Sequence, residues 1–225
     1  MSLTFHEVEK SFDGVPVLRG FSAEVPLQGL TFVVGRSGSG KSVLCRAAVG
    51  LLRLDGGQIA LDGGRVDTLP ERALRRTREQ VPYLVQSPAL LDWLTLAENV
   101  ALPGGSRADV DANLARVGLS ALGGKRPAEV GPGVRKRAAI ARALMLEPRF
   151  LLLDEPTTGL DREAAAQVNT TLAELRAQGL GALVVSHDFA AAQAFADSVL
   201  EVHQGKKGYH GPAKAFRGLT PVSVE

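Results

Sequence analysis

The chain has 225 residues, of which 45% are hydrophobic and 22% charged, a composition typical of a globular protein with one large core. Its formal net charge of +2 is too small to indicate a nucleic-acid binder. We find no apolar run of the roughly 18 residues that span a membrane and no signal-peptide pattern. The single cysteine, Cys45, cannot form an internal disulfide, which fits a reducing cytosol.

The first part of the chain predicts short strands that lead into a glycine-rich loop. Residues 3–8 partly alternate between apolar and polar side chains, and Asp13-Gly14 signals a turn. Residues 30–34 are an apolar, β-branched run typical of a buried strand, and residues 42–52 are apolar at helical spacing. The glycine-rich loop therefore lies between a strand and the start of a helix.

This loop reads Gly-Arg-Ser-Gly-Ser-Gly-Lys-Ser and matches the pattern G-x-x-x-x-G-K-[ST]. Its glycines allow backbone N–H groups to surround phosphates, while Lys41 reaches the β- and γ-phosphates and Ser42 offers its hydroxyl to Mg²⁺. A simple Gly/Ser turn is the alternative, but the flanking strand and helix favour phosphate binding. The predicted nucleotide-binding residues here are Gly35, Arg36, Ser37, Gly38, Ser39, Gly40, Lys41, Ser42 and Val43.

The middle of the chain changes character from strands to helices. Residues 58–61 and 81–85 predict strands, and Pro82 places the second at an edge or a strand start. From about residue 95 to residue 146, helical segments alternate with Gly/Pro clusters, which predicts a helical insert.

After the insert the chain alternates again between strand and helix. Residues 150–153 and 182–185 predict buried strands, an apolar face from Ala164 to Leu175 predicts a helix, and another helix begins at about Phe189. Such alternation around a phosphate loop predicts a mostly parallel sheet covered on both faces.

Polar residues follow three of these strands, where ligands of such sheets bind. Asp154 and Glu155 end the strand at 150–153, so Asp154 is a candidate Mg²⁺ ligand and Glu155 a candidate to polarise an attacking water. The alternative is a strand end capped by solvated acids. His187 follows residues 182–185 and could donate a hydrogen bond to the γ-phosphate. Gln86 follows residues 81–85 and could touch Mg²⁺ or the water, although alone it reads as a loop residue.

The order of these motifs resembles the nucleotide-binding subunit of ABC transporters, from about Leu3 to Phe216. The resemblance implies an α/β P-loop NTPase fold with a RecA-like, mostly parallel sheet, an antiparallel β lobe and an α-helical insert lobe. It implies a single ATPase domain over residues 1–225, with the core and β lobe at about 1–94 and 147–217, the insert at about 95–146 and a short tail at 218–225.

The resemblance also implies ATP and Mg²⁺ as cofactors and a head-to-tail dimer that encloses two ATP molecules. Phe12 matches the aromatic residue that stacks on adenine, and Asp161 matches a loop that crosses the dimer interface. Residues 87–100 match the surface that receives a transmembrane permease, with Trp93 either an exposed anchor or a core residue.

One family motif departs from its usual form. The signature Leu-Ser-Gly-Gly-Gln aligns with residues 130–134, where Gly131 replaces the serine, Pro132 replaces the first glycine, and Gly133 is retained. Pro132 has no N–H to donate, and the lost hydroxyl bond to a charged group would cost on the order of 1.5–3 kcal/mol. Either the chain pairs with a second ATPase that keeps an intact signature, or a homodimer has two weakened sites, or Gly131 and Gly133 suffice for the nucleotide contact.

The function implied is ATP hydrolysis coupled to membrane transport, on the inner face of the cell membrane through the permease. Its predicted catalytic residues are Lys41, Gln86, Glu155 and His187, and its predicted metal ligands are Ser42, Gln86 and Asp154. The alternatives are a regulatory ATP-binding protein with weak hydrolysis and a soluble ABC-type protein of translation or DNA repair.

The sequence Lys41-Ser-Val-Leu44, residues 86–103 and residues 135–137 resemble the ATPases of bacterial phospholipid-trafficking systems. That subtype implies a lipid cargo and a lipid-binding partner with a mammalian-cell-entry domain. These residues do not contact the cargo, so an ABC system for a different cargo stays open.

Overall fold

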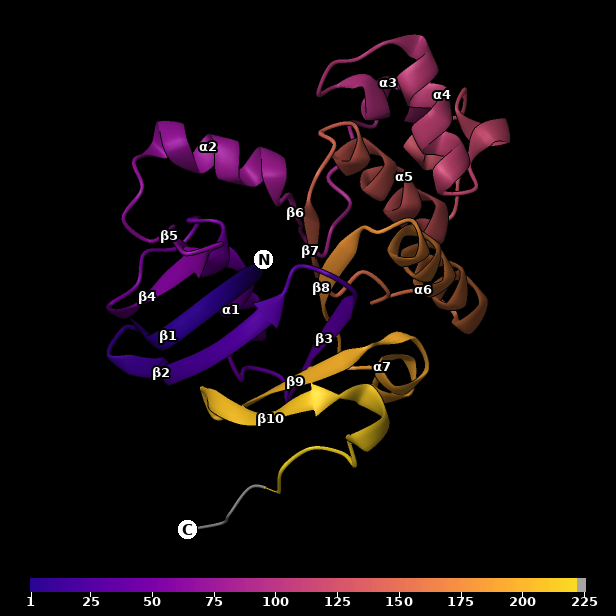
Figure 1. Cartoon of the computed structure of the whole chain (residues 1–225). Helices are drawn as coiled ribbons and strands as arrows, with labels where there is room; N and C mark the ends of the chain where they lie inside the picture. Colours follow the sequence, from indigo (N-terminus) through magenta and orange to yellow (C-terminus); the bar gives the residue numbers. More distant parts are fainter. Residues whose placement is uncertain (222–225) are drawn as a thin grey trace.

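A computed structural model describes residues 1–221 and shows a central sheet of six strands (Figure 1). Four neighbouring pairs, from β9 through β3, β8 and β7 to β6, are parallel, and β10 is antiparallel to β9. This confirms the mostly parallel sheet. In spatial order the strands are β10 (Lys206–Pro212), β9 (Ser198–His203), β3 (Leu30–Val34), β8 (Gly181–Val185), β7 (Phe150–Asp154) and β6 (Tyr83–Leu84).

The three central strands are buried along their whole length, as their apolar sequences require. Alternate residues of each strand face different clusters of the core. Phe32 and Leu153 pack with the helices that follow in the chain, whereas Val33 and Leu152 pack toward the N-terminal strands. The sheet is therefore covered on both faces.

A second, antiparallel sheet is formed near the N-terminus by β1 (Ser2–Phe12), β2 (Val15–Pro26), β4 (Gly56–Leu61) and β5 (Gly64–Arg65), in the order β2-β1-β4-β5. The expected short strands are here two long ones of 11 and 12 residues. Register shifts follow Phe5 and Lys10, and Glu7 adopts φ +47°, so the side-chain alternation breaks although the strands continue.

Helices fill the space around both sheets. The first, α1 (Lys41–Ala48), packs between the two sheets, and it ends four residues earlier than the sequence pattern predicts because Gly50 adopts φ +67°. The other helices outside the insert are α2 (Glu71–Gln80), α6 (Arg162–Ala177), α7 (Phe189–Phe195) and the 3₁₀ turn η3 (Ala213–Ala215).

The helices of the predicted insert lie together, apart from the antiparallel sheet (Figure 1). They are α3 (Leu96–Ala101), α4 (Arg107–Arg116) and α5 (Pro132–Leu144), with the 3₁₀ turns η1 (Ser120–Leu122) and η2 (Pro127–Glu129). The predicted edge strand at 81–85 shortens to Tyr83–Leu84 and does lie at the edge of the sheet. No helix within residues 1–221 has the length and apolarity to cross a membrane. The predicted tail at 218–225 falls partly on residues 222–225, outside the described part of the chain.

Candidate nucleotide site

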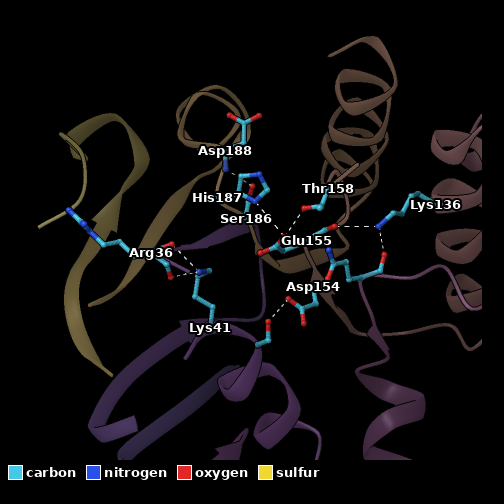
Figure 2. A network of polar contacts seen from close by, with 12 residues as sticks. Arg36, Lys41, Lys136, Asp154, Glu155, Thr158, Ser186, His187 and Asp188 are labelled. Carbon is cyan, nitrogen blue, oxygen red and sulfur yellow. Dashed lines mark hydrogen bonds and ion pairs between the residues drawn. The ribbon is translucent and has the colours of Figure 1, made fainter. Parts of the chain in front are cut away.

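The carboxyl ends of β3, β7 and β8 bring the predicted site residues to one edge of the central sheet (Figure 2). The strands are parallel neighbours, with Val33 opposite Val185 and Asp154 opposite the same residue. The phosphate loop leaves β3, Asp154 ends β7 with Glu155 directly after it, and His187 follows β8. Strand order therefore places three distant segments at one site.

The phosphate loop has a backbone path that only glycine permits at its two ends. Gly40 adopts φ +107°, and a Cβ on it would lie 2.7 Å from a methyl carbon of Leu18. A Cβ on Gly35 would lie 2.3 Å from the carbonyl oxygen of Val202. Gly40 is the N-cap of α1 and has no side chain to occupy the first helical amides, so these N–H groups are available to bind an anion. In addition, the buried Ser39 hydroxyl has no hydrogen-bond partner among the described residues. The loop thus fits a bound phosphate chain.

Lys41 lies over this loop with only 6% of its surface exposed. Its ammonium donates to the carbonyl oxygens of Gly35 and Arg36, both at 2.9 Å. Burial lowers the pKa of Lys41, while the carboxylates of Glu155 and Asp154 act against that shift. The amine is therefore held at the loop by two carbonyl oxygens, next to the acidic strand end.

Asp154 is held by two hydroxyl groups. The Ser42 hydroxyl donates to Oδ1 at 2.8 Å, and the Tyr83 hydroxyl donates to Oδ2 at 2.6 Å. Burial and the Asp154 bond both raise the pKa of Tyr83, which keeps its phenol protonated as a donor. Sequence reasoning missed Tyr83. Its position in β6, parallel to β7 and opposite Leu152, two residues before Asp154, is the signal that could have indicated it.

A hydroxyl beside a carboxylate suits Mg²⁺, which takes few protein ligands and completes its shell with phosphate oxygens and water. Within residues 1–221 no group of three or more His, Cys, Asp or Glu side chains could hold a metal alone. Ser42 and Asp154 therefore fit a metal that arrives with a nucleotide.

Glu155 has an unusual backbone and a fixed side chain. It adopts φ +47°, a region that non-glycine residues populate sparsely, and its N–H donates to Val185 at 3.0 Å. Its Oε2 accepts a hydrogen bond from the Thr158 hydroxyl at 2.6 Å and lies 3.5 Å from His187 Nδ1 (Figure 2). The carboxylate is thus held between a hydroxyl and an imidazole. Sequence reasoning missed Thr158.

Gln86 is exposed on the segment that leaves β6, the neighbour of β7, so this segment begins at the same edge of the sheet. Its backbone carbonyl accepts a hydrogen bond from Lys136 of α5. Phe12 ends β1 and is 43% exposed, with the Lys10 ammonium 5.5 Å from its ring centre. No described hydrogen bond or ion pair links Phe12 to the phosphate loop.

The remaining predicted residues lie at the starts of α5 and α6. Gly131 is the exposed N-cap of α5, and Pro132 occupies the first helical turn. Gly133 is buried against α6, where a Cβ would lie 2.9 Å from that of Ala164. Asp161 caps α6 by accepting a hydrogen bond from the Ala164 N–H at 2.8 Å. Within residues 1–221 these groups make no hydrogen bond to the phosphate loop, so one chain assembles only the first half of the predicted site.

The family model described as "ABC transporter" matches residues 18–158, which include the phosphate loop, Asp154 and Glu155. The chain belongs to the ABC transporter family. It is therefore a P-loop ATPase domain that uses ATP with Mg²⁺.

Curated relatives of this ABC cassette agree with that assignment. It is 38% identical over 200 residues to the aliphatic sulfonates import ATP-binding protein SsuB 2 of Agrobacterium fabrum, covering 88% of this chain and 74% of the relative. It is also 38% identical over 215 residues to the methionine import ATP-binding protein MetN of Caulobacter vibrioides, covering 91% of this chain and 65% of the relative. Neither relative supports the phospholipid-trafficking subtype that the sequence resembles.

Solved structures agree with the fold. The cassette matches cbiO1 from Clostridium perfringens, part of the ABC transporter complex cbiONQ, with a TM-score of 0.87 and 26% identity over 94% of this chain and 88% of that one. It matches the dimeric, ADP- and Pi-bound cassette MJ0796 with a TM-score of 0.84 and 24% identity over 95% of this chain and 100% of that one. The P-loop NTPase fold expected from the sequence is confirmed.

Proposed function

We propose that this chain is the ATP-hydrolysing subunit of an ABC importer. One observation carries the proposal: the cation of Lys41, the Ser42–Asp154 pair and the Glu155–His187 pair converge on one edge of the sheet. A phosphate-binding cation, a metal-binding pair and a candidate base are the groups that phosphoryl transfer to water requires.

Each side chain has a distinct part in this proposal. The loop amides and Lys41 bind the β- and γ-phosphates and stabilise negative charge on the transferred group. Ser42 and Asp154, with Gln86 nearby, would hold Mg²⁺, which would neutralise phosphate charge. Glu155 would accept a hydrogen bond from the attacking water, and His187, whose Nδ1 lies 3.5 Å from the Glu155 carboxylate, would donate toward the γ-phosphate.

The test replaces the candidate base while leaving the phosphate loop intact. Glu155→Gln should retain ATP binding and lower turnover by about 100-fold or more, a loss in the range of general-base catalysis. The matched control is Glu174→Gln, an exposed glutamate of α6, which should hydrolyse ATP as the native chain does. Near-native turnover of Glu155→Gln would remove Glu155 from this role.

We infer a dimer in which Phe12 stacks on adenine, and Gly131, Gly133 and Asp161 complete the nucleotide site of the partner. Residues 1–225 would then act as one ATPase domain, with core and β lobe at about 1–94 and 147–217 and the helical insert at about 95–146. Support comes from the exposure of Gly131 and Asp161 on the starts of two packed helices. The mass of the purified complex distinguishes a homodimer from a heterodimer with a second ATPase.

The proposed partners are permease subunits, which would hold the chain at the inner face of the membrane. Both curated relatives are named for import, of sulfonates or of methionine, which favours a small polar solute as cargo. A phospholipid cargo and a mammalian-cell-entry-domain partner have no support from them. Stimulation of ATP hydrolysis in the reconstituted complex, with methionine, a sulfonate or phospholipid offered in turn, decides the cargo class.

The altered residues 130–134 favour a second candidate, an ATP-binding regulator with weak hydrolysis. The two candidates differ in turnover with the permease present. Hydrolysis that the permease stimulates supports the transporter subunit, and tight ATP binding with negligible turnover in the complex supports the regulator.

A further inference from the structure

Helix α5 carries a buried lysine, Lys136, whose side chain reaches the candidate nucleotide site. Lys136 is only 8% exposed, and its ammonium donates to the carbonyl oxygens of Gln86 and, at 3.4 Å, of Glu155 (Figure 2). A buried ammonium is costly unless acceptors satisfy it, and these two carbonyls come from the ends of β6 and β7. Burial lowers the pKa of Lys136, opposed by attraction to the Glu155 and Asp154 carboxylates. One side chain therefore joins three separate segments.

A second cation of α5 holds the same segment further along. The Arg142 guanidinium donates to the carbonyl oxygens of Pro88 at 3.1 Å and of Ala89 at 2.7 Å. Ala89 adopts φ +49°, which turns its carbonyl out of any regular strand or helix. Helix α5 thus donates hydrogen bonds to residues 86–89 at both ends of that segment. Of the two donors, Lys136 and Arg142, only Lys136 also contacts Glu155.

The Glu155 backbone needs such support. Its φ of +47° is a strained conformation that persists only where surrounding contacts fix it. The Val185 carbonyl fixes its N–H, and Lys136 binds its carbonyl oxygen. A change in this peptide would turn the carboxylate away from Thr158 and His187, because side-chain direction follows the backbone.

We propose that Lys136 is a positioning residue that couples helix α5 to both Gln86 and Glu155. The exposed N-cap of α5 is Gly131, so a partner that binds there and shifts this helix would move the Gln86 segment and the Glu155 carboxylate together. The inference rests on the proposed role of Glu155 and extends it to a residue that contacts the Glu155 backbone.

The test compares Lys136→Met, which keeps the length and removes the donor, with Lys136→Arg, which keeps a cationic donor. Lys125→Met is the matched control, because Lys125 is exposed on the same group of helices. Two quantities are measured on the full chain: amide hydrogen exchange at residues 84–90 and 155–158, and the kcat and KM of ATP hydrolysis.

In Lys136→Met we expect exchange in both segments to rise about fivefold or more, since their shared tie is lost. We expect kcat to fall about tenfold with KM within about threefold of native, because the phosphate loop is untouched. Lys136→Arg should recover turnover relative to Lys136→Met, and Lys125→Met should match the native chain in both measurements.

The proposal is overturned if folded Lys136→Met exchanges at the native rate in both segments, or if exchange rises and kcat does not fall. If Lys136→Met fails to fold, the Lys136→Arg variant decides. A folded Lys136→Arg that matches Lys125→Met in exchange and kcat supports the positioning role of Lys136. A folded Lys136→Arg with native exchange and reduced kcat overturns it. Failure of the proposed function is seen separately, as an unchanged turnover in Glu155→Gln. The amide exchange measurement does not depend on ATP hydrolysis, so it tests directly whether Lys136 holds these two segments.

Discussion

Thr158 provides a sharp test of how the candidate base is oriented. Its hydroxyl donates to Glu155 Oε2 at 2.6 Å, while His187 Nδ1 lies 3.5 Å from the same oxygen. The exchange Thr158→Val preserves side-chain shape and removes the donor. We expect a lower kcat for ATP hydrolysis and an unchanged affinity for ATP, because Thr158 touches the base and not the phosphate loop.

The magnitude follows from the exposure of the carboxylate. A hydrogen bond to a charged group contributes about 1.5–3 kcal/mol. The Glu155 side chain is 25% exposed, so water replaces part of the lost bond and the lower end of that range applies. About 1.4 kcal/mol in the barrier corresponds to a tenfold fall in kcat.

Steady-state hydrolysis and equilibrium ATP binding measure the two parts of this prediction. Thr158→Ser keeps the hydroxyl and should stay near the native rate, and Thr157→Val controls for loss of a neighbouring hydroxyl. A Thr158→Val chain that turns over within twofold of native would show that the bond does not orient the base.

Three further predictions concern the core and the start of α5. The Cys45 thiol is 1% exposed and burial raises its pKa, so a thiol reagent at pH 8 should label it only after denaturation; labelling of the folded chain at the denatured rate would contradict its place in the core. Phe150 is fully buried, and Phe150→Ala should lower the free energy of unfolding by about 3–5 kcal/mol in urea titrations, where a loss below 1 kcal/mol would contradict its packing. At Gly131 a Cβ meets nothing within 4 Å, so Gly131→Ser should fold normally. Because it restores a hydroxyl donor, it should raise ATP turnover of the assembled dimer several-fold. Native turnover would mean that the hydroxyl is dispensable.

The sequence predicts well the half of the nucleotide site that this chain forms by itself, because the motifs of that half are local. The phosphate loop, Asp154 and Glu155 each follow an apolar strand, and parallel pairing alone then brings them to one edge. Their positions are confirmed by the structure, while their roles remain predictions. The lengths of β1 and β2 could not be predicted, since bulges at Phe5 and Lys10 break the alternation that marks a strand.

The contacts that hold the site were not visible in the sequence. Tyr83 and Thr158 act through single hydroxyl bonds whose partners depend on strand register and on the turn after Glu155. Lys136 lies in a helix among other basic residues, and the sequence does not show that it alone of these donates to the carbonyl oxygens of Gln86 and Glu155. Long-range packing decides these contacts, so residue spacing alone does not show them.

The altered start of α5 makes the contacts of Lys136 with Gln86 and Glu155 more important. With Gly131 as N-cap and no side chain bonded there, the first amides of the helix are free to meet an anion. Pro132 supplies no N–H, so that contact would depend on few backbone donors and hence on the orientation of the whole helix. Lys136 and Arg142 fix that orientation against residues 86–89. In the proposed dimer, a signature without its serine would therefore make the contribution to a partner's nucleotide depend more strongly on Lys136, the residue that we propose positions Glu155 in this chain.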